Sequence, residues 1–237
     1  MPFYGSVQCS YGIGRAPGRM LHSILLIYDI NTVDTRNFIK GMKWRGISVQ
    51  AVQRDVYDGT NPILSTTDHY AVILLDGATY NKDLPVGAQT ALMNYVTSGG
   101  KFIGSEWGAY QVSLNRFALM IDLVLLQRTR SSTDRIAYVI DPAYASHPIF
   151  KGFTGLIAMP ITSYNIGLVR QFGTGQQATV LATHFGETYA GIVVRELKKP
   201  DGTPGGKIVA FSHSGNYMAG VLSNKNVQRL YFNSIMW

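Results

Sequence analysis

The sequence of 237 residues has a single cysteine, Cys9, and few charged residues. One cysteine excludes an internal disulfide framework and a thiolate zinc cluster. Charged residues make up 15% of the chain, against about 25% in most soluble domains. Hydrophobic residues make up 46%, so the low charge does not mean disorder. The combination predicts a folded protein whose surface is partly covered by partners, or one that works outside the cytoplasm.

Long hydrophobic runs are also missing. No stretch reaches the roughly 18 apolar residues that a membrane-spanning helix needs. The best candidate, Phe117 to Leu126, contains Asp122. The first residues show no apolar core of a signal peptide. We therefore expect no membrane partner and no export signal, which leaves a cytoplasmic or a virion location open.

Acidic residues are the scarcer charge, with 14 acids against 21 lysines and arginines and a net charge of +7. The excess lies in residues 1–20, which have no acid, and in residues 142–237. The bases are scattered and form no dense stripe with interleaved aromatics. This pattern argues against a nucleic-acid partner and favours a mildly basic solvated surface.

Residues 1–20 have a composition of their own, with four glycines and two prolines. Within residues 3–13, apolar side chains alternate with small or polar ones, which is typical of a β-strand. The turn signal Ala16-Pro17-Gly18 separates this segment from the rest of the chain. An isolated strand needs a partner edge for its backbone groups. We therefore predict an extended N-terminal arm that docks on a neighbouring protein chain or drives self-assembly.

From residue 21 onward, apolar runs alternate with amphipathic segments. Strands are predicted at residues 23–28, 47–52, 70–75 and 101–103, and helices at 35–45, at 86–97 and from about residue 109. The second half is richer in strands, predicted at 135–140, 156–162, 178–182, 191–196 and 207–211, before a closing helix at 224–236. Alternating strands and helices predict one α/β domain over residues 21–237, a three-layer sandwich with a mainly parallel central sheet.

Ligand sites of such sheets lie at the carboxyl ends of the strands. The loops to examine therefore follow Tyr28, Leu75 and Ile103. A ligand pocket at this edge would be lined by Asp29, Asp76, Gly77 and Trp107.

The strand at 101–103 runs directly into Gly104-Ser105-Glu106-Trp107-Gly108, ahead of a helix. Such a tight strand-to-helix turn presents one side chain beside the amides of the helix N-terminus. In this chain the residue at the apex is Glu106. Ser105 is one residue away from the apex, where its hydroxyl should point into the sheet.

The order of strands, Gly99-Gly100 before the fourth strand and the turn at 103–108 resemble the class I glutamine amidotransferase-like superfamily. Residues 147–153, 206–213 and 224–237 are similar to segments of its trehalose-utilisation (ThuA-like) branch. The resemblance covers roughly residues 21–237 and implies a flavodoxin-like sandwich. The superfamily's catalytic cysteine would fall at Glu106, its histidine at His213 and its acid at Gly215. Because a thiolate nucleophile needs a cysteine, glutaminase activity is excluded.

Several roles stay open for this site. Glu106 and His213 suit general acid/base chemistry, and with Asp29 they would suit a hard or borderline metal ion. The simplest interpretation is that Glu106 caps the helix in a vestigial site, so we expect no metal and no cofactor. Ser105 is a further candidate nucleophile for a small-molecule hydrolase.

Two functions from different classes remain. The lost cysteine, the low charge and the arm favour a non-catalytic amidotransferase-like domain with a structural or assembly role. Residues 11–17 of the arm also resemble short segments of tailed-phage virion proteins, which implies a virion component. The alternative is a ThuA-like enzyme or sugar-binding protein whose pocket surrounds Glu106 and His213, with Trp107 stacking on a sugar ring.

Overall fold

The structure is a computed structural model that describes residues 22–30, 32–77, 81–105, 107–172, 177–199, 201–217 and 219–237. The side chains of residues 130–135 and 161–166 are also outside the description. The predicted arm, residues 1–20, and Glu106 lie outside the described residues.

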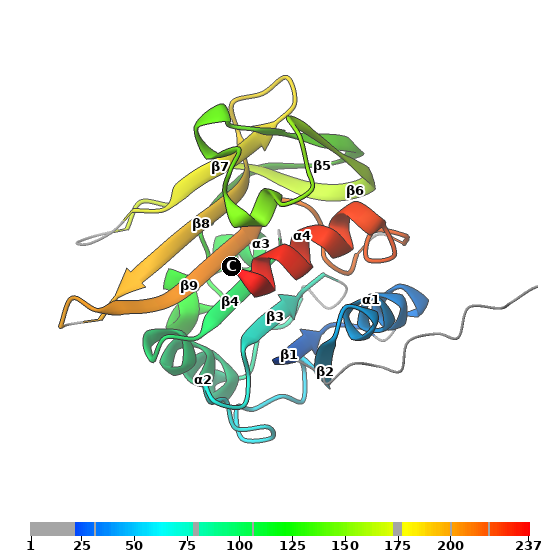
Figure 1. Ribbon diagram of the computed structural model, residues 1–237. Helices are drawn as coiled ribbons and strands as arrows, with labels where there is room; N and C mark the ends of the chain where they lie inside the picture. The colour runs from blue at the N-terminus through cyan, green and yellow to red at the C-terminus, as the bar shows by residue number, and fades with distance from the viewer. Residues whose placement is uncertain are drawn as a thin grey trace, which may run out of the picture.

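A sheet of nine strands runs through the molecule in the order β2-β1-β3-β4-β9-β8-β7-β5-β6 (Figure 1). The parallel part consists of β2 (Ile47–Gln53), β1 (His22–Tyr28), β3 (Ala71–Leu75), β4 (Lys101–Gly104) and β9 (Pro204–Phe211). The antiparallel part consists of β8 (Ala190–Lys198), β7 (Thr179–His184), β5 (Leu126–Ile140) and β6 (Leu156–Val169). The predicted α/β fold with a mainly parallel central sheet and a β-rich second half is confirmed.

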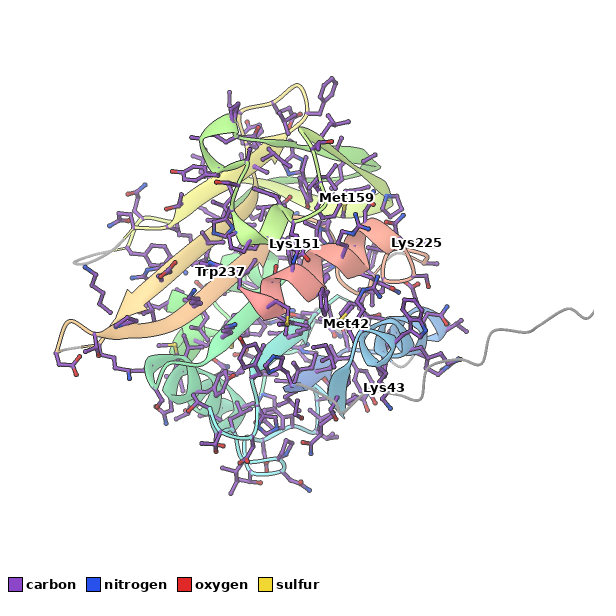
Figure 2. All side chains as sticks on the ribbon, in the orientation of Figure 1. Met42, Lys43, Lys151, Met159, Lys225 and Trp237 are labelled. Carbon is purple, nitrogen blue, oxygen red and sulfur yellow. The ribbon has the colours of Figure 1, made fainter. Side chains whose placement is uncertain are left out.

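Helices cover both faces of the parallel part. Helices α1 (Val33–Trp44) and α4 (Lys225–Met236) share one core cluster with β1 and β3, and Met42 of this cluster lies between the two helices (Figure 2). On the other face lie α2 (Val86–Thr97), α3 (Trp107–Ser113) and the short helix η1 (Ala118–Leu123). The expected three layers are therefore present, because each helix buries one apolar stripe against the sheet.

The antiparallel strands extend the same sheet beyond β9 (Figure 1). Two short helices, η2 (Pro142–Tyr144) and η3 (Pro148–Phe150), connect β5 to β6. Strand β5 begins at Leu126, well before the predicted start at residue 135. The additional residues are mostly polar, and they become a strand because β6 pairs with them along their length.

The closing helix shows how local chemistry sets the ends of an element. The Asn224 side chain accepts bonds from the backbone N–H of Asn226, at 2.9 Å, and of Val227, at 3.3 Å. Asn224 is therefore the N-cap, and α4 begins at Lys225 rather than at residue 224. At the other end of α4, the Lys101 ammonium donates to the Ile235 carbonyl at 2.8 Å. A positive charge is stabilising there because the C-terminus is the negative end of the helix dipole.

Candidate functional site

The carboxyl ends of the parallel strands gather four loops at one edge of the sheet. These loops follow β1, β3, β4 and β9, and they carry Asp29, Asp76, Gly77, Ser105, Trp107 and His213. The structure therefore brings together the loops that the strand pattern selects. The side chains themselves fall into a buried carboxylate network, a buried histidine cluster and an open cleft.

The carboxylate network joins the loops after β1 and β3. The backbone N–H of Gly77 donates to Asp29 Oδ2 and to Asp76 Oδ1, both at 3.0 Å. The Arg54 guanidinium lies 3.4 Å from Asp76 Oδ1, and Gln111 Nε2 donates to Asp76 Oδ2 at 2.9 Å. All of these side chains are buried. Both predicted pocket carboxylates therefore bind groups of the protein itself.

Burial raises the pKa of Asp76 to about 6, and the nearby charge of Asp29 acts in the same direction. Arg54, Gln111 and the Gly77 N–H lower it. Since three donors oppose the effect of burial, we take Asp76 to be ionised at neutral pH.

Arg54 is the member of this network that sequence reasoning missed. Arg54 is fully buried directly after β2, and its backbone N–H donates to the Tyr28 carbonyl at 2.8 Å. The only available signal was its place at the carboxyl end of a strand, since nothing in its sequence neighbourhood marks it as buried.

Gly77 is also the point where three loops touch. A Cβ at this position would lie 3.1 Å from the Tyr217 nitrogen and 3.2 Å from Trp107 Cδ1. Both separations are tighter than ordinary packing, so a side chain here would force the loops apart. The absence of a side chain at position 77 thus allows the loop after β9 and the start of α3 to pack closely around this residue.

Ser105 lies at the turn between β4 and α3 and faces the interior. It is 8% exposed, and within the described residues its hydroxyl has no hydrogen-bond partner. It lines a small cavity of about 20 Å³ whose other walls, apart from Asp76, are mainly apolar. Such a volume holds about one water molecule. The expected inward orientation of this serine thus agrees with its burial.

His213 is completely buried behind this edge. Its Nδ1 lies 2.8 Å from the Tyr138 hydroxyl, and the ring of Phe211 stacks on it at 5.1 Å. Among the described residues, no hydrogen-bond partner faces Nε2. Burial, followed by the nearby His184, lowers the pKa of His213 to about 3. The imidazole is therefore neutral and closed off from solvent.

A hydrogen-bonded chain continues from this histidine. The Tyr138 hydroxyl lies 3.2 Å from Ser212 Oγ, which lies 2.7 Å from His184 Nε2. Burial lowers the pKa of His184 to about 4. Sequence reasoning found His213 from the superfamily pattern but missed its partners, because β5 and β7 supply them from distant positions. The cluster stabilises two neutral histidines inside the sheet.

An open cleft of about 480 Å³ lies beside the buried groups. One wall is the start of α1 with Thr32 and Val33, and the other is the loop after β9 with Asn216 and Tyr217. The Tyr217 ring is 45% exposed and meets the Trp107 ring edge to face, with centroids 5.1 Å apart. Of the predicted pocket residues, Trp107 and Gly77 thus pack against Tyr217 in the wall of this cleft.

Glu106, His213 and Asp29 are the candidate metal ligands. In the part of the chain that the structure describes, no three His, Cys, Asp or Glu residues lie close enough to hold an ion. Glu106 is not among the described residues, so its approach to His213 stays a prediction. No described helix has the length and apolarity for crossing a membrane.

No protein-family model and no curated protein matches the chain. Solved structures do resemble it. A ThuA-like protein from Bacteroides uniformis gives a TM-score of 0.63 at 13% identity, over 96% of this chain and 94% of that one. A ThuA-like protein from Parabacteroides merdae gives 0.60 at 15% identity, over 91% and 89%. PurLQS from Thermotoga maritima gives 0.55 at 14% identity, over 90% and 96%.

These likenesses concern the fold. They give no support to the resemblance between residues 11–17 and tailed-phage virion proteins. The strand order, the loops at the carboxyl edge and these neighbours together show that the chain has the fold of the ThuA-like proteins and of PurLQS.

Proposed function

We propose that this protein is a non-catalytic amidotransferase-like domain that acts as an assembly module. In this proposal the N-terminal segment of one copy adds as a strand to the free edge of the sheet in another copy. The observation that carries it is β6, a strand of 14 residues that ends the sheet and, among the described strands, pairs only with β5.

The chemistry of the carboxyl edge supports the non-catalytic part. No cysteine lies at the strand-to-helix turn, and the histidine at the matching position, His213, is neutral and fully buried. The N–H of Gly77, a backbone donor at this edge, is bound by two carboxylates. Gly215, at the position of the superfamily's acid, has no room for a side chain. Incubation with glutamine should therefore release no ammonia above a protein-free control.

The shape of the sheet supports the assembly part. A free edge exposes backbone donors and acceptors that can pair with another chain. Two leucines near the ends of β6, Leu156 and Leu168, are 49% and 59% exposed. A strand that adds to the free edge of β6 would also bring side chains beside these two leucines.

Length favours β6 over the other edge. Eleven residues of extended chain, 3–13, span about 36 Å, β6 spans about 46 Å, and the seven residues of β2 at the opposite edge span only about 23 Å. The alternating segment therefore fits along β6 and would overhang β2. We take the partner to be a second copy of this chain, because its residues 3–13 supply an extended segment that can pair with β6.

Cys9, the single cysteine, offers a direct test because it lies inside the alternating segment. The variant Leu168→Cys places a second thiol on β6, and Ala51→Cys places one on β2 as a matched control. Mild oxidation of Leu168→Cys should yield disulfide-linked dimers and larger chains on non-reducing gels. The same variant with Cys9→Ser should not. Equal or stronger cross-linking in Ala51→Cys, or only intramolecular bonds, would contradict the proposal.

The ThuA-like alternative rests on a different observation, the exposed Tyr217 ring beside Trp107 in the 480 Å³ cleft. Aromatic rings at a cleft of this size suit a sugar ring. Saturation-transfer NMR with trehalose should then show contacts that Tyr217→Ala removes. If the folded protein shows no saturation transfer to trehalose, the sugar-binding alternative is contradicted and only the assembly function remains.

A further inference from the structure

Trp44, the last residue of α1, is the most exposed large apolar side chain of the described residues, at 89%. Lys40 and Lys43 are exposed close to it, and Arg45 follows it directly. Lys40 lies one helical turn before Trp44, on the same side of α1. Residues 35–54 contain no acid, so the indole ring lies on a positively charged part of the surface.

An open cleft of about 400 Å³ lies between α2 and the loop that follows β2. Helix α2 belongs to the core cluster on one face of the sheet and α1 to the cluster on the other, so the cleft and α1 lie on opposite faces. The cleft is of a size that takes an aromatic ring. No charged side chain is among the described residues that line it, which are Gly59, Ile63, Leu64, Ser65, Thr66, Ala91, Asn94, Tyr95 and Ser98.

Two exposed carboxylates lie at the rim of this cleft. Asp58 directly precedes the first lining residue. Asp68 Oδ2 accepts a bond of 2.7 Å from the hydroxyl of Ser65, which lines the cleft. Residues 55–81 and 84–100, which build the cleft, contain no lysine or arginine. The surroundings of the cleft are therefore negatively charged.

The indole ring among bases and the uncharged cleft beside acids are complementary in charge. Because Trp44 is exposed and the cleft lies on the opposite face, the two surfaces can meet only between copies, head to tail. We propose that Trp44 of one copy binds in the cleft between α2 and residues 59–66 of a second copy, with Lys40 and Lys43 facing the acids at its rim.

This inference deepens the assembly function and rests on it. One indole ring and a few ion pairs bury less surface than a stable dimer needs. The contact therefore strengthens binding between copies that the N-terminal arm already joins, where the effective concentration is high.

The first test is photo-cross-linking of the full chain. It uses Trp44→p-benzoylphenylalanine and, as a matched control, Phe185→p-benzoylphenylalanine. Phe185 is also an exposed aromatic residue, at 68%, but lies directly after β7. Irradiation should join position 44, and not position 185, to peptides from residues 55–101. Mixing unlabelled with ¹⁵N-labelled protein shows by mass spectrometry whether a cross-link joins two copies.

The second test measures assembly by light scattering. Trp44→Ala should raise the concentration at which the full chain assembles at least about tenfold, because buried tryptophans contribute strongly to interfaces. Phe185→Ala is the control and should leave that concentration unchanged. Circular dichroism checks the fold of each variant.

The third test exchanges the charges. Asp58→Lys together with Asp68→Lys should also raise the concentration at which the chain assembles, because like charges then face each other. Adding Lys40→Asp and Lys43→Asp to the same chain should restore assembly, since opposite charges face each other again.

Failure of this inference and failure of the assembly function give different results. The Trp44 contact would be overturned if position 44 cross-links to residues 1–20, to its own chain or to nothing. It would also be overturned if Phe185→Ala acts as strongly as Trp44→Ala, or if the charge exchange restores nothing. Disulfides of Leu168→Cys should form even with Trp44→Ala. Their absence while Trp44 is intact would contradict the assembly function itself.

Discussion

Gly215 packs directly against Ser105: a Cβ on the glycine would lie 2.9 Å from the serine hydroxyl oxygen and 2.9 Å from Leu75 Cδ2. The resemblance noted in the sequence implies that position 215 corresponds to the superfamily's catalytic acid. Here the space that an acid would need is filled by the turn after β4. The contact therefore explains in physical terms why position 215 has no side chain.

The first prediction rests on that contact. Gly215→Ala should lower the free energy of unfolding by about 1–3 kcal/mol, because the added methyl group overpacks a closed interior. Ser105→Gly in the same chain should recover part of the loss, since two of the three closest atoms, Ser105 Oγ and Cβ, are then removed while Leu75 Cδ2 stays. Gly108→Ala is the control, because its Cβ would meet Val124 at an ordinary 3.7 Å. Urea unfolding measures all four proteins, and an unaffected Gly215→Ala would contradict the packing.

The second prediction concerns the Asp76–Arg54 pair. Asp76→Asn should destabilise the fold by about 3–5 kcal/mol, because the fully buried Arg54 charge loses the closer and more deeply buried of its two carboxylate partners, Asp76 and Asp55. Arg54→Met should be similarly costly, and the double variant should lose less than the sum. Asp55→Asn should cost less than Asp76→Asn, since Asp55 lies farther from Arg54, at 4.0 Å, and pairs at 3.2 Å with the exposed Lys82. Additive losses in the double variant would argue against coupling.

The third prediction is a pH dependence. The unfolded chain protonates its histidines near pH 6.5, whereas burial lowers the pKa of His213 to about 3 and of His184 to about 4. Below pH 6.5 the unfolded state therefore binds more protons, and the free energy of unfolding falls as the pH drops toward 4. Replacing either histidine by glutamine should flatten this slope.

The raised pKa of Asp76 acts in the opposite direction. Its folded state binds more protons than the unfolded chain between about pH 3.8 and 6, which favours folding as the pH falls. The histidine effect is therefore measured directly, by NMR of the ring Cε1–H signals. Those of His213 and His184 should keep their neutral positions down to about pH 5, about one unit above the higher of the two pKa values. Titration near pH 6.5 in the folded protein would contradict the burial of these rings.

The fourth prediction tests the arm. Deletion of residues 1–19 should leave a folded domain, because the described residues from 22 onward already contain two large core clusters. The truncated protein should be monomeric in light scattering, whereas the full chain should form larger species at the same concentration. Circular dichroism checks the fold. A truncated chain that unfolds would mean that the arm completes its own core.

The sequence by itself determined the elements whose burial is regular. Residues 86–97 were predicted as a helix and form α2 with those bounds, because their apolar residues recur at helical spacing beside Gly99 and Gly100. The buried strands β1 and β3 were found within one residue, since each is a short apolar run. The loops after Tyr28, Leu75 and Ile103 followed from this alternation, and with them the neighbourhood of Asp29 and Asp76, whereas His213 followed from the superfamily resemblance.

Tertiary structure alone decided which side chains meet. The polar first half of β5 has no strand pattern and is a strand because β6 pairs with it. Arg54 joins Asp76 from 22 positions away in the chain, and Tyr138 reaches His213 from the antiparallel half of the sheet. Periodicity reports how deeply each segment is buried, but it carries no information on which distant segment lies opposite. Long-range pairing therefore turned the expected pocket carboxylates and histidine into closed internal networks and left the open cleft at Tyr217.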